Sequence, residues 1–462
     1  MRSTIGVYMR NSEILIASIS IASLVLVSVL CGIYAPYHEE PAEDGGPEDF
    51  VPILRFAVAS DVHIDDSGSV LEEERLAKLF EYAYGYADGH GTYDSLDGVF
   101  FAGDFTNRGT PTSMRKFFDI VDDSVRDGTV VRPVLGNHEF YFDGSSVEDD
   151  FLTVSGYDSP DAHLELNGYH FILLSAGKGN HGDGYDEAAR TWLEKELEKA
   201  YSDDRTRNRP IFVFTHHAVK GTVYGSELWY TNDLDGILEE YEQVVHFSGH
   251  SHFPINDPRS IWQGDFTALN TGTLSYAEMD LAGIRDGYVW PADHEGGYDL
   301  NGRRMTETAQ FYIVEVDSKG SILIHGIDII SGEPVMVPLY IPSVSDKRDF
   351  TYTDDRRKTA DTPEFSDDDA VIVESVNNGE VKLRFTQADC DDTVQHYVAE
   401  LYENGTLVSK EYCLSGMFFD PMPETLVVSF DGIEGSKEYS VSIFAVSPWE
   451  KRSEPISVTF TT

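Results

Sequence analysis

Two kinds of residue are scarce in this chain of 462 residues, cysteine and the basic side chains. There are 3 cysteines, and one of them, Cys31, lies inside an apolar run. This leaves Cys390 and Cys413 as the pair that a disulfide can join near the C-terminus. Spacing alone does not decide between a bond and two free thiols, so both states remain open.

The shortage of positive charge is pronounced. The chain has 34 Lys and Arg against 81 Asp and Glu, a net charge of −47. Such a surface repels phosphate backbones and argues against polymeric nucleic acid as a partner. The simplest reading of the charge is a solvated acidic surface, and adaptation to salt or an extracytoplasmic setting predicts the same balance.

Residues 14–34 are an apolar run, long enough to span a bilayer as a helix. Arg2 and Arg10 precede the run and acidic residues follow it, which places the N-terminus inside and the rest of the chain outside the cytoplasm. The run is longer than a usual signal-peptide core, and Leu30 departs from a lipoprotein cleavage site. We therefore expect an uncleaved signal-anchor, with a cleaved signal and secretion as the alternative.

After an acidic stretch rich in Pro and Gly, strand and helix patterns alternate. Alternation of this kind predicts a layered α/β domain, and its hairpin at Asn167-Gly168 requires mixed strand directions. The expected strands are 56–60, 98–102, 130–135, the hairpin 164–175, 211–215, 244–248, 266–275 and 311–330, and the expected helices are 69–87, 113–125, 187–200 and 234–241.

Beyond residue 369 the helical pattern stops, and short alternating segments separated by turn residues predict an all-β sandwich of about seven strands. The strand 439–443, followed by Ser453-Glu454-Pro455, resembles the end of a fibronectin type III domain, although Phe385 stands where that family usually has tryptophan. The expected strands are 370–375, 380–386, 396–402, 407–412, 425–430, 439–446 and 456–460.

Five strands of the α/β region end in residues that can bind metal ions. Ligands of open α/β sheets bind at the carboxyl ends of the strands, and neighbouring glycines let the backbone approach an ion closely. The groups are Asp61 with His63, Gly103-Asp104, Gly136-Asn137-His138-Glu139, His216-His217, and Gly249-His250-Ser251-His252.

In this order the groups resemble the motifs of the calcineurin-like metallophosphoesterases, over about residues 53–330. The resemblance implies a four-layer α/β (α+β) sandwich with mixed β-sheets and two metal ions bridged by Asp104. It assigns one ion to Asp61, His63, Asp104 and His252, and the other to Asp104, Asn137, His216 and His250.

The chemistry of these side chains agrees with the resemblance. Imidazoles, carboxylates and one amide oxygen suit Zn, Fe or Mn rather than Ca or Mg. Two such divalent or trivalent ions can acidify a shared water to a hydroxide that attacks phosphorus in line. The resemblance implies that His138 contacts the substrate phosphate or the leaving group. Arg108 resembles an arginine that binds phosphate in some relatives; the alternative is a loop arginine that neutralises acidic neighbours.

For several other histidines and one acid we expect roles other than metal binding. Two adjacent residues in extended backbone face opposite ways, so we expect only one of His216 and His217 to bind metal. The resemblance implies that the ligand is the histidine directly after the strand, His216, and leaves His217 at the rim or behind the ligands. Glu139 is expected to support its loop, and His246 to be a core histidine. The remaining histidines match no motif and are expected to pack or lie at the surface: His163, His170, His181 and His325.

The sequence thus predicts a dinuclear metal-dependent phosphoric ester hydrolase outside the cytoplasm, acting on a phosphomonoester or phosphodiester that is a small molecule or a cell-surface or lipid phosphate. The alternatives are a non-catalytic surface binding or adhesion protein and a nucleotide pyrophosphatase or nuclease. The expected parts are a cytoplasmic tail 1–13, the membrane anchor 14–34, a linker 35–52, the phosphoesterase domain 53–335, a linker 336–369 and the fibronectin type III-like (immunoglobulin-like) sandwich 370–462.

Overall fold

A computed structural model describes residues 47, 49–142, 145–177, 184–228, 230–231, 233–280, 288–289, 299–300, 302–377 and 379–462. The expected membrane anchor at 14–34 lies outside these ranges. Within them, no helix is both long enough and apolar enough to cross a membrane.

Two six-stranded sheets form the centre of the α/β region, and both mix parallel and antiparallel neighbours, as the sequence predicted. The first sheet has the order β18-β17-β16-β1-β2-β3. Its strands are β18 Leu339–Ile341, β17 Ile322–Asp328, β16 Gln310–Asp317, β1 Pro52–Ala59, β2 Gly98–Phe101 and β3 Val130–Pro133.

The second sheet has the order β10-β11-β9-β6-β5-β4, in which β5, β6, β9 and β11 run parallel. Its strands are β10 Ile261–Gln263, β11 Thr267–Asn270, β9 Val244–Ser248, β6 Ile211–Phe214, β5 Tyr169–Leu173 and β4 Ala162–Leu166.

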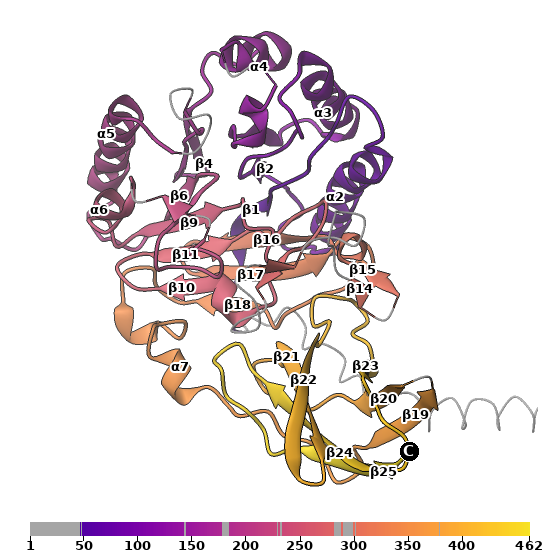
Figure 1. Ribbon diagram of the computed structural model, residues 1–462. Coiled ribbons are helices and arrows are strands. Elements are labelled where there is room, and N and C mark those ends of the chain that lie inside the picture. The colour runs from indigo at the N-terminus through magenta and orange to yellow at the C-terminus, as the bar shows by residue number, and fades with distance from the viewer. Residues whose placement is uncertain are drawn as a thin grey trace, which may run out of the picture. The chain divides into compact units, whose positions relative to one another are not determined.

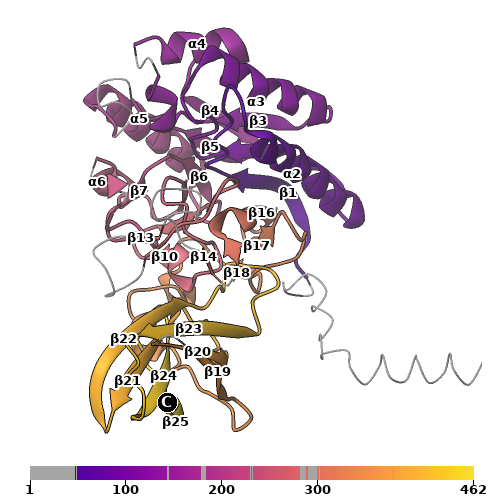
Figure 2. The same ribbon diagram turned by 45° about the vertical axis from the view of Figure 1, so that its right-hand side comes forward.

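The sheets face each other across a core rich in phenylalanine, and helices cover their outer faces, so the expected four-layer arrangement is confirmed (Figure 1). The ring of Phe56, on β1, lies 4.8 Å from that of Phe212, on β6. In both views α2 and α3 lie on one side of the sheets, and α5 and α6 on the other (Figure 2). The helices are α2 Val70–Gly89, α3 Pro111–Ser124, α4 Val147–Ser155, α5 Glu187–Asp203 and α6 Asp235–Leu238.

Local chemistry accounts for the helix and hairpin boundaries. Thr110 caps α3 by accepting the Ser113 N–H, and Asp186 caps α5 in the same way from Ala189. The hairpin β4–β5 turns at Asn167-Gly168, both at positive φ, as predicted.

Three expected elements differ from the structure. The helix expected at 234–241 is only the short α6, Asp235–Leu238. The strand expected at 266–275 ends at Asn270, because residues 271–278 leave the sheet and hydrogen-bond to other loops. The strand expected at 311–330 is two strands, because a turn with Gly320 at φ 87° reverses the chain between β16 and β17.

The C-terminal region is an all-β pair of sheets with the seven strands that the sequence predicted. One sheet has the order β19-β20-β23 and the other β22-β21-β24-β25. Cys390 is half-buried and Cys413 is buried, and no disulfide joins them in the described part of the chain. The strands are β19 Val371–Asn377, β20 Glu380–Thr386, β21 His396–Glu403, β22 Thr406–Leu414, β23 Thr425–Asp431, β24 Glu438–Val446 and β25 Ile456–Thr461.

The remaining elements are short. The stretch expected as a linker contributes β18 to the first sheet and also holds α7 Arg356–Thr359. Short strand pairs complete the fold: β7 Ala218–Val219 with β8 Tyr230–Thr231, β12 Met279–Asp280 with β13 Tyr288–Val289, and β14 Asp299–Leu300 with β15 Arg303–Arg304.

Candidate metal centre

The loops after β1, β2, β3, β6 and β9 bring the seven predicted ligands together. These strands run parallel within their sheets, so their carboxyl ends share an edge. Three groups of side chains there have ligand atoms within 4.8 Å of one another: Asp61, His63 and His252; His63, Asp104 and His138; and Asp104, His216 and His250.

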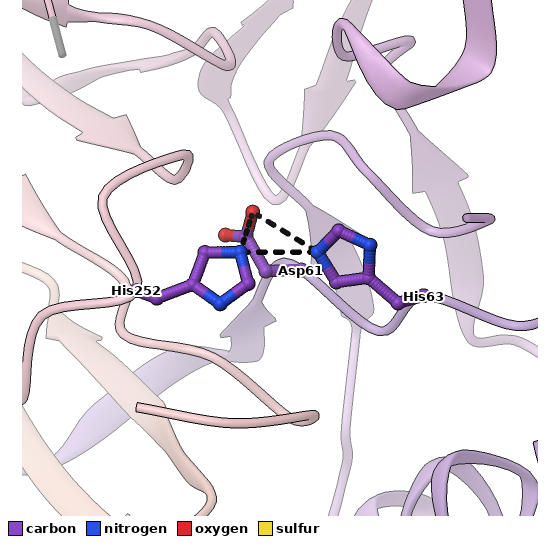
Figure 3. A group of neighbouring side chains, drawn as sticks. All are labelled: Asp61, His63 and His252. Atoms are coloured by element: carbon purple, nitrogen blue, oxygen red, sulfur yellow. Dashed lines mark hydrogen bonds and ion pairs between the residues drawn. The ribbon is translucent and has the colours of Figure 1, made fainter. Parts of the chain in front are cut away.

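In the first group the side chains of Asp61, His63 and His252 point at one another (Figure 3). The Nε2 atoms of His63 and His252 are 3.0 Å apart, and His252 Nε2 is 3.2 Å from Asp61 Oδ1. His252 Nδ1 donates to the Tyr276 carbonyl at 2.8 Å, which leaves Nε2 to face the other two side chains.

The second group lies around His216. Its Nε2 is 3.1 Å from Asp104 Oδ2, 2.9 Å from Asn137 Oδ1 and 3.1 Å from His250 Nδ1. Its Nδ1 donates to the Ala102 carbonyl at 2.9 Å, so Nε2 faces the group in the orientation that a metal ligand needs.

The spacing and the charge of both groups suit a cation. Ligand atoms about 2.1 Å from one ion lie about 3.0–3.4 Å apart, close to the separations in both groups. Burial lowers the pKa of His252, but Asp61 outweighs it and raises this pKa to about 9. Asp104 likewise outweighs burial and raises the pKa of His216 to about 9. A metal ion would take the place of these protons and would neutralise the same buried carboxylates.

The backbone of the centre is strained. Five of the seven predicted ligands have φ in the left-handed region, where residues other than glycine are rare: Asp61, His63, Asp104, His250 and His252. Strain of this kind persists where the surrounding structure enforces it, and it clusters at functional sites.

Two glycines allow the ligand loops to approach. A Cβ atom on Gly136 would lie 2.2 Å from Asp104 Oδ1, and one on Gly249 would lie 2.6 Å from Asp61 Oδ2. Both contacts are shorter than van der Waals packing permits, so the strand ends can meet only with glycine at these positions.

The three other residues of the predicted site differ in position. His138 Nε2 lies 4.0 Å from Asp104 Oδ2, beside both ligand groups. Glu139 is fully buried and accepts hydrogen bonds from the backbone of Asp104, Thr106 and Gly136, as expected for a loop support. Arg108 has a side chain that is 63% exposed, with Nε 3.8 Å from Asp65 Oδ2.

Other histidines lie behind or away from the centre. His217 is buried, with its ring centroid 4.7 Å from that of His250, and burial lowers its pKa to about 3. His246 is a core histidine, as expected, with Nε2 2.7 Å from Thr215 Oγ1. His163 pairs with Glu196 at 2.6 Å. His181 lies outside the described residues.

The comparison with protein families reproduces the resemblance seen in the sequence. Residues 54–254 match the family model described as calcineurin-like phosphoesterase. This part of the chain is a calcineurin-like phosphoesterase domain. The match includes all seven predicted ligands.

Comparison with curated proteins finds no match. Among solved structures, the chain is similar to a purple acid phosphatase from yellow lupin (Lupinus luteus) seeds, with 14% identity, 64% of this chain covered and a TM-score of 0.41. It is also similar to the twitchin kinase region of C. elegans, with 18% identity, 22% of this chain covered and a TM-score of 0.16. The chain spans 54% and 16% of the lengths of these two proteins.

Three further residues beside the ligands were missed by the sequence analysis. The half-buried Tyr276 has its ring centroid 4.4 Å from that of His252 and 5.8 Å from that of His63. Glu278 is buried near Asp61, and burial raises its pKa to about 7. On the other side, Tyr141 accepts a hydrogen bond from Asn137 Nδ2 at 2.8 Å. These residues follow no ligand motif. The one signal for Tyr141 is its place in the loop of Asn137.

Proposed function

We propose that the protein is a metal-dependent phosphoesterase with two metal ions, which hydrolyses a phosphomonoester or a phosphodiester. The observation that carries the proposal is the convergence of the seven predicted ligands at one edge of the sheets, within a calcineurin-like phosphoesterase domain. Asp104 is grouped there with His216 and His250, and also with His63 of the first group. The donor set of imidazoles, carboxylates and one amide favours Mn, Zn or Fe.

Each ion has its own residues in this proposal. Asp61, His63 and His252 hold one ion, Asn137, His216 and His250 hold the other, and Asp104 lies between them. When bound, the ions would supply Lewis-acid chemistry: they would lower the pKa of a water molecule so that hydroxide could attack phosphorus. The carbonyls of Tyr276 and Ala102 orient two of the imidazoles.

His138 is the proposed catalytic residue for the leaving group. Its Nδ1 is 3.1 Å from the Asn107 carbonyl, which turns Nε2 toward Asp104 and the centre. From this position Nε2–H can donate a proton to the departing oxygen, a step typically worth about 10²–10⁴-fold in rate. Arg108, whose exposed side chain lies with Nε 3.8 Å from Asp65 Oδ2, is the proposed phosphate-binding arginine.

The setting of the enzyme is part of the proposal. The apolar run at 14–34, followed by acidic residues, supports a membrane-anchored enzyme whose catalytic domain lies outside the cytoplasm. The sheets of three and four strands support a fibronectin type III-like C-terminal domain. The substrate is then a small-molecule phosphoester or a phosphate at the cell surface.

A panel of phosphoesters, run with metal analysis of the full chain, tests the function. We expect hydrolysis of an aryl phosphate or diester that a chelator abolishes and that Mn²⁺ or Zn²⁺ restores. His250→Ala should abolish it, whereas His163→Ala, which alters a histidine paired with Glu196, should not. A purified chain with no bound metal and no turnover across the panel would instead favour a non-catalytic surface protein.

A further inference from the structure

The loop formed by residues 271–279 touches every ligand of the first metal group. Thr273 Oγ1 donates to the Asp61 carbonyl at 3.1 Å. The Tyr276 carbonyl accepts from His252 Nδ1, and the Tyr276 ring lies against the rings of both His252 and His63. The loop therefore contacts the backbone of Asp61 and the side chains of His252 and His63.

The opposite side of this loop is buried in the C-terminal sandwich. Ala277 and Met279 are 1% and 0% exposed, and they belong to the same apolar cluster as the sandwich core. Met305 of the neighbouring turn is in that cluster too, and its carbonyl accepts the Ala277 N–H at 3.0 Å. One apolar core thus extends from the sandwich strands to Ala277 and Met279, which follow Tyr276 in the loop.

Hydrogen bonds fasten the sandwich to the same region. Thr308 Oγ1 donates to the Phe418 carbonyl at 2.6 Å, and Asn256 Nδ2 donates to the Met417 carbonyl at 2.7 Å. Asn256 lies four residues after His252. From α2, the Arg75 guanidinium donates to the Leu274 carbonyl at 2.9 Å and also reaches the Ser275 carbonyl.

We propose that the C-terminal sandwich is a structural part of the metal centre: it holds the loop 271–279 so that Tyr276 orients His252 and covers His63. Loosening the sandwich at this contact should therefore weaken the group of Asp61, His63 and His252 and spare the group of His216 and His250. The inference rests on the proposed metal site and is independent of the identity of the substrate.

Two matched variants of the full chain test this. Phe418 and Phe430 are each 1% exposed, and both belong to the sandwich cluster. The Phe418 carbonyl is bonded to Thr308, whereas Phe430 lies near the end of β23 farther along the chain, paired with Val381. Both variants therefore remove a phenylalanine side chain from the same core. Phe418→Ala removes it beside the contact with Thr308, and Phe430→Ala removes it within β23.

The probe is Co²⁺, followed by its visible absorption and by metal analysis after dialysis. We expect wild type and Phe430→Ala to retain two Co²⁺ per chain. Phe418→Ala should retain about one Co²⁺ per chain, because the affinity of the other site is weakened about tenfold or more. The two variants should lose a similar amount of melting temperature, since each removes a buried phenylalanine. Equal Co²⁺ binding by the two folded variants would overturn the inference, as would equal weakening of both ions.

Should Phe418→Ala fail to fold, Thr308→Val removes only the hydrogen bond to the Phe418 carbonyl. We expect it to weaken one Co²⁺ site about threefold, and unchanged binding would overturn the inference. A wild-type chain that binds Co²⁺ but hydrolyses no phosphoester would refute the proposed function. The comparison of Co²⁺ binding by the variants would still decide whether the sandwich holds the loop 271–279.

Discussion

Asp104 is grouped with ligands from both sides of the centre. Its Oδ2 is 3.1 Å from His216 Nε2, and it also belongs to the group of His63 and His138. Asp61 lies in one group only, with His63 and His252. At the scale of single residues, substitution of Asp104 and substitution of Asp61 should therefore change the metal content differently.

Asp104→Asn keeps the shape of the side chain and removes its charge, so we expect both ions to be disturbed. Asp61→Asn should empty mainly one site. Activity should fall about 100-fold or more in both variants, because each loses charge stabilisation in a buried centre. Metal content per chain, measured together with turnover, distinguishes the two variants. An Asp104→Asn variant with full metal content and full activity would refute the site assignment.

At the scale of elements, β21 shows how the sandwich strands are bound together by charge. Glu400 on this strand accepts hydrogen bonds from Lys410 on β22 at 2.7 Å and from Arg452 at 3.0 Å. Burial raises the pKa of Glu400, but these partners and Tyr402 outweigh it and lower the pKa from 4.5 to about 2.

A carboxyl group with a lowered pKa stabilises the folded state above its unfolded pKa, and this contribution is lost as the pH falls through the folded pKa. We expect Glu400→Gln to lower the free energy of unfolding by about 1 kcal/mol at pH 6. The difference from wild type should shrink between pH 4.5 and pH 2. Denaturant unfolding at several pH values measures it, and a difference that does not change with pH would contradict the assigned ion pairs.

At the scale of the whole molecule, the shared apolar core links the metal centre to the C-terminal sandwich. Residues 46–462 form one compact unit. Metal that binds only the folded state stabilises it by mass action, by about 2.7 kcal/mol at 100 times the dissociation constant. Through the shared core, this stabilisation should extend to the sandwich.

We therefore expect saturating Mn²⁺ or Zn²⁺ to raise the melting temperature of a single calorimetric transition by several degrees. EDTA should reverse the shift, and Mg²⁺ at the same concentration serves as the control ion. Two separate transitions, with the second unaffected by metal, would show that the sandwich unfolds independently of the centre.

Much of this architecture follows from local sequence patterns. Asn167-Gly168 defines a hairpin turn because both residues tolerate positive φ, and the alternating segments after residue 369 correspond to the seven strands of the sandwich. The expected helix at 234–241 was too long, and the expected strand at 266–275 extended into a loop. The helix gives way to local turns, in which the Glu240 N–H bonds to Ile237 and the Tyr241 N–H to Leu238. The strand ends because the chain after Asn270 bonds to distant segments, and local propensity does not report such contacts.

The sequence by itself predicted the seven candidate ligands, because metal chemistry requires particular side chains and parallel strands deliver their ends to one edge of a sheet. In the tertiary structure His216 faces Asp104 and Glu139 supports the loop, as the sequence analysis expected. Only the tertiary structure placed Tyr276 against His63 and His252, on a loop whose other side is buried in the sandwich. The reason is that these roles depend on contacts between segments far apart in the chain, which no local pattern encodes.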